Sequence, residues 1–96
     1  MKRLKKPILT YLAFMSDINL VKIGKSKDFE SRKNQLITAN PLINSFYLIH
    51  SDVEKLLHNY FYELKIKGEW FIYEDKQIFL DEVKHILIDL EENKLL

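Results

Sequence analysis

The chain has 96 residues, a length that fits one domain with a modest core. It contains no cysteine, which excludes a disulfide scaffold and any cysteine-ligated zinc site. The net charge is only +1, yet residues 1–34 hold nine Lys/Arg and three Asp/Glu, and residues 35–96 hold six and eleven. This asymmetry fits either a phosphate-facing surface with a solvated rear face or the chance clustering of a basic tail.

The N-terminal region lacks the pattern of a secretion signal or a membrane anchor. Residues 1–6 carry four basic side chains, and an apolar run from Ile8 to Met15 follows. That run is too short to span a bilayer, contains Thr10 and Tyr11, and is not followed by a small-residue cleavage site. We therefore expect a cytoplasmic protein with no membrane partner.

The first third of the chain predicts a β-hairpin followed by a helix. Residues 7–14 are apolar and rich in β-formers, and the polar cluster 16–19 is typical of a turn. A second short strand is expected over residues 20–24, where side chains alternate in character. Asp28 is a good N-cap for a helix that runs to about residue 37.

The remaining elements alternate between strands and helices. A strand is expected over residues 43–50, followed by a helix that Ser51 or Asp52 caps and Gly68 ends. An aromatic strand or extended segment is expected over 70–73, and a final helix from Asp75 or Lys76 to about residue 92. This order predicts one α/β (α+β) domain over residues 1–96, with its core at about 8–80 and a mainly antiparallel sheet of about three strands flanked by helices. The middle helix is the clearest, because its apolar side chains form one stripe: Val53, Leu56, Leu57, Tyr60, Phe61 and Leu64.

Polar side chains in two regions could carry chemistry. Glu54 and His58 are four residues apart on the expected middle helix, so they are neighbours that could bind a divalent metal, although spacing alone favours an ordinary solvated face. Five basic side chains follow one another through the second strand, its loop and the first helix, and they suit either phosphate binding or simple solvation. These are Lys22, Lys25, Lys27, Arg32 and Lys33.

Several short motifs follow one another in a fixed order. They are Val21-Lys22-Ile23-Gly24-Lys25-Ser26, Arg32 followed by Gln35-Leu36, Asn40-Pro41, Glu54 with His58, and Gly68-Glu69-Trp70-Phe71. Over about residues 8–80 this ordered set resembles the GIY-YIG endonuclease superfamily, in its short KIG/GEWF branch typified by a phage T5 open reading frame. The resemblance implies a metal-dependent endonuclease that hydrolyses DNA, with RNA left open as a partner, acting as a monomer or homodimer.

The resemblance also assigns roles to individual residues. Tyr11 matches the tyrosine of the first signature, Arg32 the phosphate-binding arginine, Lys25 a lysine of some members, and Glu54 the carboxylate that binds Mg²⁺ or Mn²⁺. Lys22 stands at the position of the second signature's tyrosine, where it becomes a further catalytic candidate. Phosphate contacts are expected from Lys22, Lys25, Lys27, Arg32, Lys33 and His58.

Two positions leave a second function open. Lys22 replaces a tyrosine, and Leu36 stands where many members have Tyr or His. A free tyrosine has a pKa of about 10, so Tyr11 would act as a base only if a cation, for which Lys22 and Lys25 are candidates, lowered that pKa. The alternative is a catalytically inactive nucleic-acid-binding or protein-interaction module of the same fold, with a role in phage–host conflict.

Overall fold

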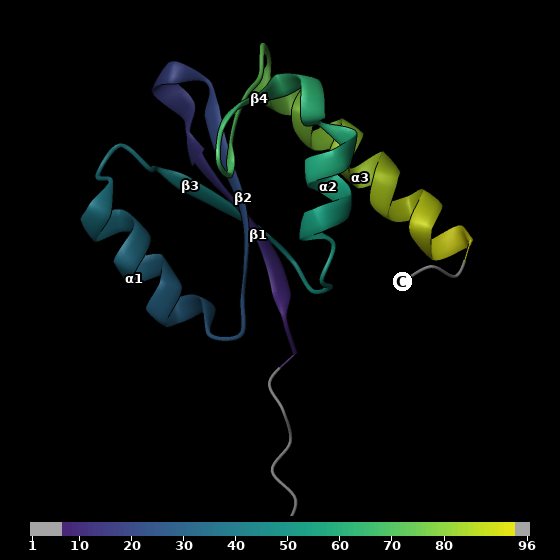
Figure 1. Ribbon diagram of the computed structural model, residues 1–96, viewed down its shortest axis with the longest axis horizontal. Coiled ribbons are helices and arrows are strands. Elements are labelled where there is room, and N and C mark those ends of the chain that lie inside the picture. The colour runs from purple at the N-terminus through teal and green to yellow at the C-terminus, as the bar shows by residue number, and fades with distance from the viewer. Residues whose placement is uncertain (1–6, 94–96) are drawn as a thin grey trace, which may run out of the picture.

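A computed structural model describes residues 7–93 of the chain (Figure 1). The basic residues of the N-terminal segment 1–6 and residues 94–96 lie outside the described part, so the predicted basic tail is outside it too. The elements follow in the order β1 (Leu9–Met15), η1 (Ser16–Ile18), β2 (Leu20–Ser26), α1 (Phe29–Ala39), β3 (Ser45–Ile49), α2 (Glu54–Tyr60), η2 (Tyr62–Leu64), β4 (Lys65–Lys67), β5 (Trp70–Ile72) and α3 (Lys76–Glu92).

The described strands form one antiparallel sheet in the order β3-β1-β2-β5-β4. The predicted count of about three strands was therefore too low, because β4 and β5 join the sheet as a second hairpin. Gly68 closes this hairpin with a φ of 56°, a left-handed conformation that glycine adopts without strain. Each of the two strands has three residues, which is too short for an alternating pattern to stand out in the sequence.

Helices cover both faces of the sheet, so the protein has two apolar cores. Figure 1 shows α1 on one side of the sheet and α2 with α3 on the other. The larger core lies on the α2 and α3 side, and the smaller lies under α1. Strand β1 contributes to both, because alternate side chains point to opposite faces: Leu12 and Phe14 to the larger core, and Tyr11, Ala13 and Met15 to the smaller one.

The cap predicted for the first helix is confirmed, and the last helix has an equivalent one. Asp28 accepts a hydrogen bond from the backbone N–H of Ser31 at 3.3 Å, and Asp75 accepts one from that of Ile78 at 3.0 Å. Both helices begin directly after these residues. Within residues 7–93, none of the helices combines the length and the apolar character that crossing a bilayer would need.

The middle helix is shorter than its apolar stripe predicts. Helix α2 ends at Tyr60, and the chain continues as the 3₁₀ turn η2 before β4. Leu57 is fully buried in the larger core, whereas Leu56 is 37% and Tyr60 58% exposed. Only one narrow side of α2 meets this core, and the neighbouring side lies against strand β2.

We predict that Leu57→Ala lowers the free energy of unfolding by about 2–5 kcal/mol, because it leaves a cavity in the larger core. The adjacent Leu56→Ala is the matched control and should cost less than about 1 kcal/mol, since much of that side chain is already in water. Urea unfolding of both variants measures the difference, and equal losses would contradict the placement of α2.

Candidate functional site

Strand β2 changes its neighbour halfway along. Strand β5 pairs with it only from Leu20 to Lys22. At the next residue, the Ile23 N–H donates to the carbonyl of Glu69 at 3.0 Å, and the Ile23 carbonyl accepts from His58 Nε2 at 2.8 Å. Helix α2 therefore lies where a further strand would otherwise continue, and it brings its own side chains beside β2.

Tyr11 and Gly24 are directly opposite each other on β1 and β2, so their side-chain positions share one face of the sheet. A Cβ atom built on Gly24 would lie only 2.4 Å from both Cζ and the hydroxyl oxygen of Tyr11. The tyrosine ring thus passes over the glycine, and its hydroxyl reaches across β2. On its other side the ring contacts Phe29 of α1, with centroids 5.7 Å apart.

The Tyr11 hydroxyl lies in a mixed electrostatic environment. Burial raises the pKa of Tyr11, and the negative charge of Glu69 raises it further. Arg32 opposes both through its positive charge and by hydrogen bonding, while the charge of Glu54 adds a smaller rise. Because the net direction is upward, Tyr11 is protonated at neutral pH and presents a hydrogen-bond donor.

Four groups from separate parts of the chain therefore act on the same place. Tyr11 comes from β1, Arg32 from α1, Glu54 from the first turn of α2, and Glu69 from the turn before β5. Arg32 is exposed, and Glu54 and Glu69 are half-buried, so charged groups accessible to water surround a buried hydroxyl. Of the residues expected from the motifs, Arg32 and Glu54 are thus the two whose charges act on the Tyr11 hydroxyl.

The two expected catalytic lysines each face a carboxylate. Lys22 Nζ is 3.6 Å from Glu69 Oε2, and Lys25 Nζ is 3.9 Å from Asp52 Oδ2. The expectation that these lysines lower the pKa of Tyr11 does not match the structure, in which Arg32 is the cation that acts on the hydroxyl.

The other expected nucleic-acid contacts differ in position. Lys27 is exposed after β2, and Lys33 Nζ lies 5.8 Å from the centroid of the Phe46 ring. His58 is half-buried and turned toward the sheet, where its ring packs edge-on against Phe71 with centroids 4.9 Å apart. Its hydrogen bond to β2 gives His58 a structural task; phosphate contact by these three residues stays a prediction.

Glu69 is the site residue that sequence reasoning missed. It belongs to the motif Gly68-Glu69-Trp70-Phe71, which marked the resemblance, but no role was assigned to its carboxylate. With Glu54 it gives the site two carboxylates whose charges both reach Tyr11. Within residues 7–93, no three His, Cys, Asp or Glu side chains gather into a metal-binding cluster. One or two carboxylates nevertheless suit Mg²⁺ or Mn²⁺, because such ions keep several waters and take substrate phosphate as a ligand.

Comparison with known families identifies the domain. The family model of the T5orf172 domain matches residues 9–91, a span that includes Tyr11 and the three charged groups that act on its hydroxyl. The chain belongs to the T5orf172 domain family. This is a phage-associated, nuclease-like domain. No curated protein and no solved structure matches the chain.

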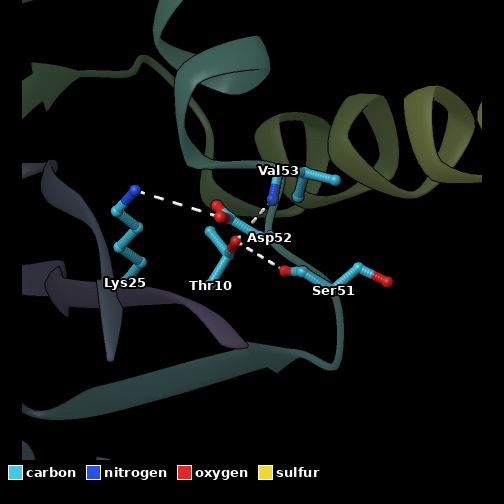
Figure 2. Close-up of polar contacts among 5 residues, drawn as sticks. All are labelled: Thr10, Lys25, Ser51, Asp52 and Val53. Carbon is cyan, nitrogen blue, oxygen red and sulfur yellow. Dashed lines mark hydrogen bonds and ion pairs between the residues drawn. The ribbon is translucent and has the colours of Figure 1, made fainter. Parts of the chain in front are cut away.

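In this T5orf172 domain, a buried hydroxyl fixes the start of α2. Figure 2 shows Thr10 of β1 between Ser51 and Val53. Thr10 Oγ1 donates to the Ser51 carbonyl at 2.7 Å and accepts from the Val53 N–H at 2.9 Å. Val53 directly precedes Glu54, so the position of the Glu54 carboxylate depends on a side chain next to Tyr11 in the sequence. The ion pair of Lys25 with Asp52 lies beside the same turn.

We predict that Thr10→Val lowers the free energy of unfolding by about 1–3 kcal/mol, because it leaves the half-buried Ser51 carbonyl and the buried Val53 N–H without their partner. Thr10→Ser keeps the hydroxyl and is the matched control, with a smaller loss from the missing methyl group. Urea unfolding compares the two. A larger loss in the serine variant would mean that packing of the methyl, rather than the two hydrogen bonds, holds this turn.

The raised pKa of Tyr11 predicts a pH dependence of stability. The folded protein holds the Tyr11 proton more tightly than the unfolded chain, whose tyrosine pKa is 10.0. The resulting stabilisation is fully present below about pH 10 and is lost as the pH rises through the folded pKa. Tyr11→Phe cannot titrate, so it should lose less stability than the wild type over the range from about pH 10 upward.

Urea unfolding across that pH range provides the measurement. Tyr73, whose pKa burial also raises, is present in both proteins, so the difference between them reports on Tyr11 alone. Identical pH profiles would show that the Tyr11 hydroxyl is not in the environment described above.

Proposed function

We propose that this T5orf172 domain is a metal-dependent endonuclease that hydrolyses phosphodiester bonds, with DNA as the expected substrate and RNA as the other candidate. The supporting observation is that Arg32 of α1 and Glu54 of α2 both act electrostatically on the hydroxyl of Tyr11 in β1. The motif resemblance to the GIY-YIG superfamily points to the same chemistry and the same three residues.

Arg32 is suited to hold the substrate phosphate. Its guanidinium is exposed, lies within reach of the Tyr11 hydroxyl, and can donate two parallel hydrogen bonds to phosphate oxygens. Negative charge increases on those oxygens as water attacks, so a fixed cation there stabilises the transition state more than the bound substrate.

Tyr11 acts next to this phosphate. Because burial and two carboxylates hold its pKa up, its hydroxyl donates a hydrogen bond, either to a phosphoryl oxygen or to the attacking water. The close approach to Gly24 restricts the ring, so the hydroxyl is oriented before the substrate binds. A bound phosphodiester monoanion would add a negative charge near the hydroxyl, whereas Arg32 is the group that favours loss of the hydroxyl proton.

The carboxylates are suited to a divalent ion. Glu54, with Glu69 nearby, would hold Mg²⁺ or Mn²⁺, which supplies charge stabilisation to the phosphoryl group and a more acidic water molecule when bound. Lys22 sits against Glu69 and keeps that carboxylate partly neutralised. Lys25, Lys27 and Lys33 extend the positive charge along the loop after β2 and the first turns of α1, where they would contact the nucleic-acid backbone.

The test is a nicking assay on supercoiled plasmid with Mg²⁺, with Mn²⁺ and with chelator. We expect metal-dependent nicking by the wild type and a loss of at least about 100-fold in Glu54→Gln, because the variant loses the charge that holds the ion. Glu91→Gln, which neutralises an exposed carboxylate at the end of α3, is the matched control and should retain the wild-type rate.

The other outcomes would point to a different metal site or a different function. Nicking by Glu54→Gln at the wild-type rate would remove Glu54 from the metal site. No nicking by the wild type, together with a salt-sensitive gel shift, would favour a non-catalytic nucleic-acid-binding module. If the gel shift were absent as well, a protein partner would become the target of the search.

A further inference from the structure

Part of the sheet face that carries Tyr11 is left open by α1. The core under this helix is made by β1, by α1 itself and by residues of and before β3, and partly buried Leu20 and Trp70 pack against its margin. One row of paired residues crosses four strands. Ala13 of β1 pairs with Lys22 of β2, Lys22 with Trp70 of β5, and Trp70 with Lys67 of β4. Such residues share one face of the sheet. Exposure increases along the row, from fully buried Ala13 through half-buried Lys22 and Trp70 to exposed Lys67. In Figure 1 the hairpin that contains β4 stands clear of α1.

This open row begins at the candidate site. Lys22 contacts Glu69, and Glu69 acts on the Tyr11 hydroxyl. Lys67, at the far end, forms no ion pair within residues 7–93. Two cations therefore flank one aromatic ring, along a line that leads away from the residues proposed to cut the backbone.

The alternation of cation, aromatic and cation suits a nucleic-acid strand. Lysine ammonium groups neutralise phosphates, and an aromatic ring stacks on a base whatever its identity. Neighbouring strands are about 4.8 Å apart, so the two lysines are about 10 Å apart at their backbones, and their long side chains can adapt to the spacing of a flexible strand. Ile72, also on this face and 47% exposed, extends the apolar surface beside Trp70.

We propose that the Lys22–Trp70–Lys67 row binds an unpaired nucleic-acid strand next to the scissile bond, with a base stacked on Trp70 and a phosphate on Lys67. The inference rests on the proposed function, because that function supplies the nucleic acid. It adds a substrate preference: the domain binds substrates in which a single-stranded segment extends from the site over the second hairpin.

Trp70 provides a direct readout because it is the only tryptophan of the chain. We would titrate the wild-type protein with a labelled single-stranded oligonucleotide in the presence of chelator, which prevents cleavage. Fluorescence anisotropy reports binding anywhere on the protein, whereas tryptophan emission reports on this row. We expect saturable quenching of Trp70 emission with the same dissociation constant that anisotropy gives.

A matched pair of variants separates the row from general charge. Lys67→Ala should weaken binding and make the slope of log K against log salt shallower by about 0.7, the value for one lost contact with a single strand. Lys84→Ala removes the same charge from α3, on the other side of the sheet, and should leave the slope unchanged. Equal slopes in the two variants would show that the row does not bind the strand, and so would oligonucleotide binding without a change in Trp70 emission. Nicking that depends on Glu54 would be unaffected by either result.

Two further results have separate meanings. If the wild type neither nicks plasmid nor binds the oligonucleotide, both the proposed function and this inference are overturned. An acidic peptide of equal charge could compete as strongly as an unlabelled oligonucleotide and quench Trp70 to the same extent. That result would overturn the nucleic-acid assignment and make the row a protein-binding surface.

Discussion

The close approach of the Tyr11 ring to Gly24 is the contact on which the rest of the site depends. Because residue 24 has no side chain, the ring can lie across β2 and place its hydroxyl near the strand's far edge. There β5 stops pairing, and Glu54 and Glu69 approach from α2 and from the turn before β5. The candidate site thus lies on the central strands of the sheet, with a core on each face to hold it rigid.

The fold was predictable from sequence where local signals were strong. The first hairpin has two apolar runs around a polar turn, and α1 and α3 have aspartate caps that the structure uses. The second hairpin was not predictable in the same way. Strand β4 follows an apolar stripe that looks helical up to Leu64, and its pairing with β5 is decided by the turn at Gly68 and by contacts with β2.

The candidate site shows the same division between local and long-range information. Ordered motifs point to Tyr11, Arg32 and Glu54, and the charges of Arg32 and Glu54 act on the Tyr11 hydroxyl in the structure. The contribution of Glu69 could not be read from spacing, because it depends on where β5 ends against β2. The inward turn of His58 has a similar cause, since a helix beside a strand edge finds a backbone carbonyl that a solvated helix would lack.

The outermost strand of the second hairpin also affects how the sheet ends. An exposed sheet edge can pair with the edge of another molecule and so promote aggregation. Strand β4 has three exposed residues, two of them lysines, with an irregular register against β5. Short, charged and irregular edges are poor templates for strand addition, so β4 closes the sheet on this side with no covering element among residues 7–93. The same lysines that discourage a second copy of the sheet stay available to a partner of opposite charge.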